Sequence, residues 1–329
     1  MSEMFNPSFF SSSLQTIKSA VLCLYPQGFR VLGAVALILG ISQMTSSNQA
    51  QTLKQDQTSL TWESHEERPY NVQIKDVVAI VTGGTKGLGK NFVEHLLKEH
   101  AKVAFGGTSV ALGEKMEKQY GAEYGADKVM FCPLDVTKHE SFENIFIKAK
   151  AKWGGVDLLV NNAGVGYEDK DNWERTIDIN FKGSVRGQLL AVEHMGKHKG
   201  GRGGTVVMIS SRTALIPGYL WPLYSTTKKA QLAYTEAMGD EFYEKHFNIR
   251  TMSLCPGLTD SDLPDYQGEN PYIPELKPIL GNRSLSATKQ RPESVSKGLL
   301  QIIRNGTTGS IWLVENDESP RQIHFYNDF

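Results

Sequence analysis

The chain has 329 residues, of which 40% are hydrophobic and 22% are charged, and its 35 basic and 36 acidic residues give a formal net charge of -1. That length allows one large domain or two small ones with a sizeable core. A balance this close to neutral lacks the basic surplus that non-specific nucleic-acid binding requires, so we expect no nucleic-acid partner. The cysteines Cys23, Cys132 and Cys255 are too few and too far apart for a disulfide framework or a CxxC metal site. We therefore expect no metal and a reducing compartment.

Residues 1–72 differ in composition from the rest, and we expect them to form an N-terminal extension. They contain an apolar run at 31–41, preceded by Arg30, and a polar linker over 42–72. The run is shorter than the about 17–25 apolar residues of a membrane span, but it matches the about 7–15 residues of a signal-peptide core. Two interpretations remain open: a membrane-associating or organelle-targeting segment, or a poorly ordered extension of a cytoplasmic protein.

From residue 73 to residue 316 the sequence alternates short apolar segments with amphipathic ones. The predicted strands are Val77–Val81, Lys102–Phe105, Val129–Cys132, Val156–Val160, Thr205–Ile209, Ile249–Leu254 and Ser310–Val314, and two of the predicted helices are Asn91–Lys98 and Lys229–Met238. This alternation is typical of a parallel sheet covered by helices on both faces and joined by right-handed crossovers. The predicted fold class is α/β: a single Rossmann-type domain with a doubly wound, parallel, seven-stranded sheet.

Two segments, one within residues 73–316 and one after them, show no clear hydrophobic periodicity. The stretch over 260–291 is irregular and long enough to be a substrate loop. Residues 317–329 follow the last predicted strand, and we expect them to form a C-terminal tail.

A glycine-rich segment, Thr82–Gly89 (TGGTKGLG), directly follows the first predicted strand and leads into a helix. We expect Gly83 to turn the chain, Gly87 to let backbone approach a pyrophosphate, and Gly89 to pack the helix closely against the strand. The free amides and the dipole at the helix N-terminus then favour the phosphates. A glycine-rich turn without a ligand is the alternative, and the ordered strands and helices around the segment make it the weaker one.

If the glycine loop holds a dinucleotide that exchanges a hydride with a carbinol carbon, the site also needs a group that exchanges the hydroxyl proton near neutral pH. A tyrosine can do this when a cation lowers its pKa from about 10, and a lysine four residues later on the same helical face supplies one. Two pairs have this spacing: Tyr124 with Lys128, and Tyr224 with Lys228. Spacing alone does not choose between them.

The surroundings favour the second pair. Tyr124 lies in a predicted loop, and Ala111 stands where a hydroxyl would be needed. Tyr224 opens a helix after Pro222, and Ser211 lies thirteen residues upstream at the end of the fifth strand, where open α/β sheets bind ligands. Ser210 is one residue off that spacing.

In this order the motifs resemble the classical short-chain dehydrogenase/reductase family. The resemblance covers about Val77 to Val314 and rests on the TGxxxGxG loop, on NNAG at Asn161–Gly164, and on the Ser-x12-Tyr-x3-Lys pattern. The segment Asn172–Asn180 looks most like the 15-hydroxyprostaglandin dehydrogenase branch. The resemblance implies an NAD(P)-dependent oxidoreductase that transfers a hydride between a nicotinamide and a secondary alcohol or ketone.

The resemblance also implies roles for matching residues. Ser211 would hold and polarise the substrate oxygen, Tyr224 would be the acid/base, and Lys228 would bind the nicotinamide ribose while lowering the pKa of Tyr224. Asn180 would complete a proton relay through water, and Asp135 would contact the adenine. The segment after the sixth strand would contact the carboxamide, with Ser261 or the nearby Thr259 replacing the family's threonine. The implied cofactor-binding set is Gly83, Lys86, Gly87, Leu88, Gly89, Asp135, Val136, Asn162, Ala163, Gly164, Tyr224, Lys228, Pro256, Gly257 and Ser261.

The choice between NADP and NAD stays open. NAD-preferring enzymes carry an acidic residue at the end of the second strand, where it repels a 2′-phosphate. Here that strand ends in Phe105–Ser109 (FGGTS), without a carboxylate, and Lys86 stands where it could pair with the phosphate. The residues favour NADP slightly, whereas the branch that the chain resembles is linked to NAD.

The substrate is predicted to be a secondary alcohol or its ketone. Several apolar residues precede Tyr224 and favour a lipid-like substrate, although packing beneath the 260–291 loop explains them equally well: Leu215, Ile216, Tyr219, Leu220 and Trp221. The family commonly associates through the helices on either side of the fifth strand, so the resemblance implies a homodimer or homotetramer.

Three alternatives compete with the catalytic interpretation. A non-catalytic dinucleotide-binding sensor or scaffold would have lost the serine or the Tyr–Lys pair, and both are intact. An extended-type epimerase or dehydratase would need a larger C-terminal substrate domain than the residues after Val314 provide. A membrane-tethered enzyme would differ in location and not in chemistry.

Overall fold

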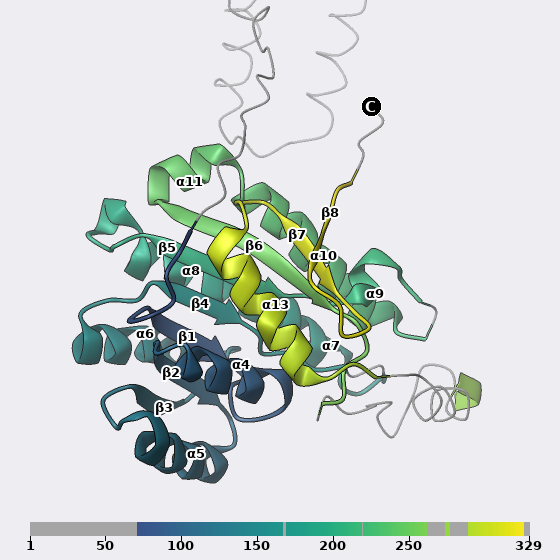
Figure 1. The fold of residues 1–329 in the computed structure, drawn as a ribbon. Coiled ribbons are helices and arrows are strands. Elements are labelled where there is room, and N and C mark those ends of the chain that lie inside the picture. The colour runs from purple at the N-terminus through teal and green to yellow at the C-terminus, as the bar shows by residue number, and fades with distance from the viewer. Residues whose placement is uncertain (1–70, 167–168, 219, 262–273, 277–288, 326–329) are drawn as a thin grey trace, which may run out of the picture. The chain divides into compact units, whose positions relative to one another are not determined.

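The computed structural model describes residues 71–166, 169–218, 220–261, 274–276 and 289–325. The described residues form an eight-stranded sheet in the order β3-β2-β1-β4-β5-β6-β7-β8, with helices on both faces (Figure 1). Neighbouring strands pair in parallel, except that β8 runs antiparallel to β7. The strands are β1 (Val78–Thr82), β2 (Lys102–Gly107), β3 (Val129–Pro133), β4 (Leu158–Asn161), β5 (Gly204–Ile209), β6 (Ile249–Pro256), β7 (Ile311–Val314) and β8 (Arg321–Ile323).

The predicted Rossmann-type sheet is confirmed, but the predicted number of strands is wrong. All seven predicted strands form, with ends that differ by at most two residues from the prediction. The eighth, β8, lies in the predicted C-terminal tail, where Arg321 pairs with Leu313 and Ile323 pairs with Ile311. Arg-Gln-Ile is too short and too polar for hydrophobic periodicity to reveal, and only the partner strand defines it.

Helices cover both faces of this sheet. They are α4 (Gly87–Lys98), α5 (Val110–Tyr124), α6 (His139–Trp153), α7 (Trp173–Ile177), α8 (Gly183–Met195), α9 (Arg212–Leu215), α10 (Pro222–Met238), α11 (Glu241–Phe247) and α13 (Pro292–Asn305), with short 3-10 turns at Lys197–Lys199 and Pro274–Leu276. The two predicted helices are thus confirmed, and both begin earlier than the sequence indicated.

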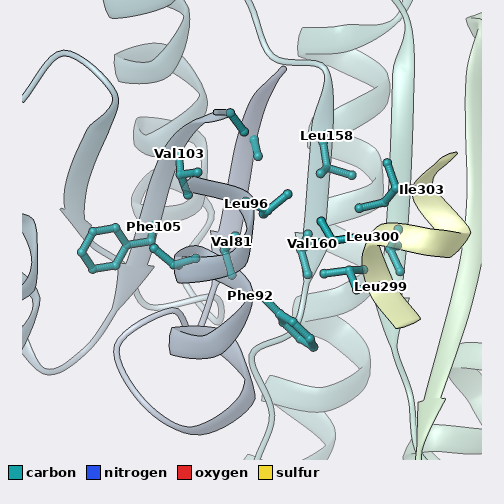
Figure 2. Close-up of a cluster of buried hydrophobic side chains, with 14 of the residues drawn as sticks. Val81, Phe92, Leu96, Val103, Phe105, Leu158, Val160, Leu299, Leu300 and Ile303 are labelled. Atoms are coloured by element: carbon teal, nitrogen blue, oxygen red, sulfur yellow. The ribbon is translucent and has the colours of Figure 1, made fainter. Parts of the chain in front are cut away.

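One face of the sheet packs against α4, α5 and α13. Phe92 and Leu96 of α4 and Leu299 of α13 lie on Val81 and Val160, in a cluster that joins strands from both halves of the sheet (Figure 2). Successive residues of a strand point to opposite faces, so Val81 belongs to this cluster while its neighbour Ile80 belongs to the other.

The opposite face packs against α6, α8 and α10. Phe142 and Phe146 of α6 and Leu190 of α8 lie against Ile80, and Leu232 of α10 packs with Cys255 of β6. This layer is where the helix that carries Tyr224 meets the sheet, and its packing determines how that helix is placed.

A π-helical turn, Asp178–Lys182, joins α7 to α8 into one helical stretch. The amide of Gly183 donates to the carbonyl of Asp178, five residues earlier. Turns of this kind are rare and frequently occur at functional sites. This one carries Asn180 at its centre.

Most of two predicted segments lies outside the described residues: the N-terminal extension with its apolar run at 31–41, and the substrate loop over 260–291. At the predicted domain boundary, the Val72 amide donates to the Arg304 carbonyl at 3.2 Å, and Ile74 is buried in the core. Among the helices of the described ranges, none has the length and apolar character needed to cross a membrane.

Candidate active site

Helix α10 presents Tyr224 and Lys228 on one side. The helix begins at Pro222, whose restricted φ and missing amide hydrogen suit the first helical position. Residues four apart in an uninterrupted helix lie on the same face, and Lys228 Nζ is 5.6 Å from the centre of the Tyr224 ring. Lys229 points elsewhere: it is exposed, with Nζ 4.2 Å from the Phe325 ring.

Lys228 is a buried lysine with 3% of its surface exposed. Its Nζ donates a hydrogen bond to the carbonyl of Ile209 at 2.8 Å. Burial lowers the pKa of Lys228 to about 8, because desolvation disfavours the charged form. An ammonium group has three donors, and within the described residues Lys228 uses one of them, which leaves two N–H groups for ligand hydroxyls.

Two adjacent serines follow β5, and the structure separates their roles. Ser211 caps α9: its hydroxyl accepts the Thr213 amide at 3.1 Å, and it also hydrogen-bonds to Tyr224. The Ser210 hydroxyl instead donates to the carbonyl of Lys228 at 2.9 Å. Ser211 therefore faces the tyrosine, and Ser210 fastens the strand to the helix that carries it.

The surroundings of Tyr224 shift its pKa. Burial raises the pKa of Tyr224 to about 12, and the hydrogen bond with Ser211 offsets part of that rise. Lys228 is not among the causes of this shift, so the lowering that the resemblance implied stays a prediction. The net shift favours the protonated phenol.

Asn180 is fully buried between two segments of the site. Its Oδ1 accepts the Val165 amide, and its Nδ2 donates to the Val165 carbonyl, both at 2.8 Å. Nδ2 also donates to Thr227 Oγ1 on α10 at 3.1 Å. A Cβ on Gly164 would lie 3.3 Å from both Asn180 Oδ1 and Lys228 Nζ, so these two groups converge on the same backbone.

The glycine loop is tied to the segment after β4. The hydroxyl of Thr82, the last residue of β1, accepts the amides of Asn162 and Ala163, each at 2.9 Å. The Asn162 side chain returns a bond to the Thr82 carbonyl at 2.8 Å. β1 and β4 are the neighbours at which the strand order reverses, and doubly wound sheets bind dinucleotides at that point.

Two glycines of the loop have backbone reasons to be glycine. Gly83 has φ +63°, a conformation that residues with a side chain seldom adopt. A Cβ on Gly89 would lie 2.1 Å from the Gly83 carbonyl oxygen, so a side chain there would force the turn open. Gly89 is thus required by the turn itself and not only by helix packing.

The N-terminus of α4 suits an anion. Lys86 precedes it in an extended conformation without capping it, and the first turn has no acidic residue. Gly87 begins the helix, with φ +51°. Leu88 is partly buried against the core, which anchors that turn. Together with the donors of Lys228 and the glycine backbone, these residues fit the pyrophosphate and ribose of a dinucleotide.

Asp135 and Val136 follow β3. Asp135 Oδ1 accepts the amide and hydroxyl of Thr137 at 2.9 and 2.7 Å. Burial raises the pKa of the Asp135 carboxyl, but these two hydrogen bonds together with the nearby Lys138 and Arg175 hold the pKa below its usual value. Val136 is buried, and its carbonyl accepts a bond from Arg186 on α8 at 2.5 Å.

The segment after β6 is held by the strands beside it. Pro256 ends β6, and the Gly257 amide donates to the Val314 carbonyl at 2.7 Å. Thr259 Oγ1 donates to the Gly257 carbonyl at 2.9 Å, while Ser261 is partly exposed. Thr259 Oγ1 also accepts a bond from Gln290 Nε2 at 3.0 Å, so its hydroxyl has a role in the turn, and the carboxamide contact of either residue stays a prediction.

The first tyrosine–lysine pair is separate from this arrangement. Tyr124, expected in a loop, is instead the last residue of α5 and packs against the core. Lys128 pairs with Asp76 at 3.3 Å. That pair therefore does not belong to the candidate site.

Sequence reasoning missed Thr82 and Thr227 as parts of the site. Thr82 was quoted only as the first letter of the glycine motif, although its hydroxyl links β1 to the segment after β4. Thr227 lies between Tyr224 and Lys228, and its hydroxyl binds Asn180. A hydroxyl residue inside a Tyr-x3-Lys motif was the available signal.

These strand ends bring together a glycine loop, a buried lysine and a tyrosine bonded to a serine, and they define a nicotinamide-dependent oxidoreductase. Residues 77–271 match the model of the short chain dehydrogenase family. The chain belongs to that family, acts on alcohols or ketones, and uses a nicotinamide dinucleotide.

Among curated relatives, the 15-hydroxyprostaglandin dehydrogenase [NAD(+)] of Bos taurus is 29% identical over 77% of this chain and 95% of its own length. The human protein of the same name is 30% identical over 58% of this chain and 71% of its own. Alcohol dehydrogenase 1 of Ceratitis capitata is 31% identical over 56% of this chain and 71% of its own.

Solved structures share the fold. A short-chain dehydrogenase/reductase from Burkholderia phymatum in complex with NAD has a TM-score of 0.63 at 18% identity, covering 70% of this chain and 87% of that one. The 3-ketoacyl-(acyl-carrier-protein) reductase of Brucella melitensis complexed with NADH has a TM-score of 0.61 at 20% identity, covering 73% and 97%.

Proposed function

We propose that Tyr224, Ser211, Lys228 and Asn180 carry the oxidation of a secondary alcohol or the reduction of its ketone. The observation that supports this most directly is the hydrogen bond between Ser211 and Tyr224 beside the buried Lys228. General acid–base chemistry needs the proton-transferring group within hydrogen-bond reach of the reacting oxygen. An alcohol oxygen bound by Ser211 would meet that condition.

Each side chain has a distinct task in this proposal. Ser211 orients the substrate oxygen, and Tyr224 takes the hydroxyl proton or returns it. Lys228 holds the ribose hydroxyls with the donors it has left, and its charge favours the tyrosinate. Asn180 keeps the backbone at Val165 in place beside them. When bound, the oxidised nicotinamide accepts the hydride and adds the positive charge that a tyrosine with a pKa of about 12 needs.

A screen of ketones and secondary alcohols with NAD(H) and NADP(H), run beside Tyr224→Phe, tests the assignment. We expect turnover by the wild type and a loss of about 10²–10⁴-fold in kcat for the variant, which is the usual contribution of general acid–base catalysis. A variant with full activity would overturn the mechanism. Complete inactivity of the wild type would favour the sensor or scaffold alternative.

We propose NADP as the preferred cofactor. β2 ends in Gly106 and Gly107, and the next residues, Thr108 and Ser109, carry no negative charge. A Cβ on Gly107 would lie 2.8 Å from the hydroxyl of Thr85, so an acidic side chain does not fit there unless Thr85 moves. NAD remains the alternative, since NAD appears in the names of the bovine and human relatives.

Lys86 is the cation that would contact a 2′-phosphate. Its side chain is exposed and makes no ion pair among the described residues. Lys86→Ala should raise KM for NADPH about tenfold and leave KM for NADH unchanged, because an exposed charge-assisted contact to phosphate contributes about 1–2 kcal/mol. Lys90→Ala, which removes an exposed lysine one helical turn later, is the matched control. A strong preference of the wild type for NADH would contradict this proposal.

We propose an apolar, lipid-like substrate. The Trp221 ring lies 6.5 Å from the Tyr224 ring, and a Cβ on Gly166 would approach both rings, at 3.9 and 4.0 Å. Ile216 is 64% exposed, whereas Leu220 is buried, so only part of the apolar stretch is explained by packing. A series of secondary alcohols with lengthening alkyl chains should show kcat/KM rising with length, and a flat series would contradict the proposal.

We propose self-association through α8 and α10. Leu189 of α8 is 57% exposed, and a second chain packed on α8 would cover it. Light scattering should give a dimer or tetramer for the wild type and a smaller species for Leu189→Lys. A monomeric wild type would contradict it.

We propose a cytoplasmic enzyme whose residues 1–70 determine any membrane or organelle association. Fractionation of the full chain beside a chain starting at Asn71 tests this, and identical distribution of both would remove the membrane proposal. The shorter chain begins before Val72 because Val72 and Ile74 belong to the domain.

A further inference from the structure

A buried glutamine on α10 contacts the π-turn that carries Asn180. Gln231 has 1% of its surface exposed. It follows Lys228 by three residues and Tyr224 by seven, so all three lie on one face of the helix. The same helical face therefore carries the acid/base, the lysine and this amide.

The contact is made through the amide nitrogen. Gln231 Nε2 donates to the Asn180 carbonyl at 2.8 Å and to Ser184 Oγ at 2.6 Å. Ser184 Oγ in turn donates to the same Asn180 carbonyl at 2.6 Å. The carbonyl at the centre of the π-turn is thus held by two side-chain donors, one from its own helical stretch and one from α10.

The amide oxygen shows that this position is not occupied for packing alone. Gln231 Oε1 is buried and has no hydrogen-bond partner in the part of the chain that the structure describes. An apolar side chain of similar size would avoid leaving a carbonyl oxygen unpaired in the interior. The donor on Nε2 is what the glutamine supplies and a leucine would not.

The position of the Asn180 backbone determines whether its side chain can make its hydrogen bonds. It binds both polar backbone atoms of Val165 and the hydroxyl of Thr227. A small rotation of the π-turn would misalign these bonds together, and with them the backbone at Gly164 that faces Lys228. The amide of Gln231 opposes that rotation from the helix that holds the lysine.

We propose that Gln231 is a positioning residue, whose amide clamps the π-turn so that Asn180 stays aligned with Tyr224 and Lys228. This inference rests on the proposed function for its kinetic consequence and on geometry for the clamp itself. Gln231 touches neither substrate nor cofactor, and it acts through Asn180.

The chain supplies a matched control in Gln188 of α8. Gln188 also has 1% of its surface exposed, and its Oε1 is also buried without a hydrogen-bond partner among the described residues. Its Nε2 donates to Thr251 Oγ1 on β6 at 3.1 Å, where Gln231 Nε2 donates to the π-turn. Gln231→Leu and Gln188→Leu therefore remove the same group from comparable surroundings, and any shared loss of stability is accounted for.

Hydrogen exchange of the full chain tests the clamp without relying on turnover. In Gln231→Leu, amides of the peptide spanning 178–184 should exchange about tenfold faster than in the wild type, because local opening becomes easier. Gln188→Leu should leave that peptide unchanged. Unchanged exchange in Gln231→Leu, or an equal rise in both variants, would overturn the clamp.

Kinetics test its consequence. We expect Gln231→Leu to lower kcat about tenfold with KM for the nicotinamide cofactor unchanged, since misplacing a reacting group affects turnover more than binding. Gln231→Met keeps the size but lacks the donor, and it should lose as much. In an Asn180→Ala background, Gln231→Leu should have little further effect, because both act through one unit. Full activity of Gln231→Met, or an undiminished effect in that background, would overturn the inference. Should Tyr224→Phe remain active, the proposed function fails, while the exchange experiment still decides the clamp.

Discussion

The two tyrosine–lysine pairs of this chain share a spacing of four residues and differ in everything around it. Tyr124 ends α5, and Gly125 follows with φ +110°, so Lys128 is no longer on the same helix. Tyr224 and Lys228 lie within one helix, and the lysine is 3% exposed. The side chain of Lys128 is 29% exposed and pairs with Asp76.

The comparison shows that a four-residue spacing makes a tyrosine–lysine pair useful for catalysis only when the helix between the two residues is continuous and the lysine is buried. Four residues place two side chains together when the helix between them is unbroken. Burial then alters the pKa of Lys228 and leaves its remaining donors for a ligand. Gly125 ends the helix between Tyr124 and Lys128, so the first pair has neither a continuous helix nor a buried lysine.

Substituting each tyrosine by phenylalanine is the sharpest way to break the comparison. Tyr224→Phe should lower kcat about 10²–10⁴-fold because the acid/base is lost. Tyr124→Phe should leave kcat unchanged, since Tyr124 ends α5, packs against the core and does not belong to the candidate site. Steady-state kinetics and thermal melts measure both. Equal losses in the two variants would refute the distinction.

Substitution of the two lysines should change kcat by a smaller factor than substitution of the two tyrosines. Lys228→Met should lower kcat about 10²-fold and raise KM for the cofactor, because both the charge and the ribose donors disappear. Lys228→Arg should not restore activity, since a guanidinium cannot replace an ammonium in so enclosed a site. Lys128→Met should change neither constant, and a fall in kcat there would contradict the assignment.

The pH dependence of the free energy of unfolding should also distinguish Lys228 from Lys128. The pKa of Lys228 is about 8 in the folded chain against 10.5 for an ordinary lysine, so the unfolded chain binds more protons between these values. The stability of the wild type relative to Lys228→Met should therefore rise through this pH window, by a few kcal/mol at about 1.4 kcal/mol per pKa unit.

Urea unfolding of wild type, Lys228→Met and Lys128→Met at pH 7 to 10 measures the effect. Tyr224 acts in the opposite sense at higher pH, because its folded pKa of about 12 exceeds its usual 10.0, so its contribution is lost above pH 10. A difference between wild type and Lys228→Met that stays constant from pH 7 to 10 would show that Lys228 is not desolvated.

The smallest effect is expected at the exposed ion pair. In this pair, a hydrogen bond from Lys128 holds the pKa of Asp76 below its usual value. Asp76→Asn should nevertheless leave activity and melting temperature unchanged in 1 M salt, because solvent and ions screen such pairs. A clear loss of activity would imply that the region of the first pair contributes to the site after all.

Local motifs account for most of what the sequence could predict. The glycine loop, the NNAG segment and the Ser-Tyr-Lys spacing are short patterns whose geometry follows from the strand or helix that contains them. The seven parallel strands could also be predicted, because most of them are largely apolar runs buried on both faces of the sheet.

The remaining features depend on contacts between distant segments. Thr82 acts on residues some eighty positions later, and Gln231 acts on Asn180 across a helix interface. Nothing in the neighbouring letters distinguishes Gln231 from any other polar residue of α10. β8 was missed for the same reason, since three residues become a strand only through β7.

β8 also protects the sheet against aggregation, because it covers the edge of β7. Without it, β7 would present an unpaired edge to other chains. Glu315 accepts bonds from Arg321 of β8 at 3.1 Å and from Arg212, the neighbour of Ser211, at 3.0 Å. Trimming or tagging this end would therefore disturb solubility first, and the segment at Ser211 next.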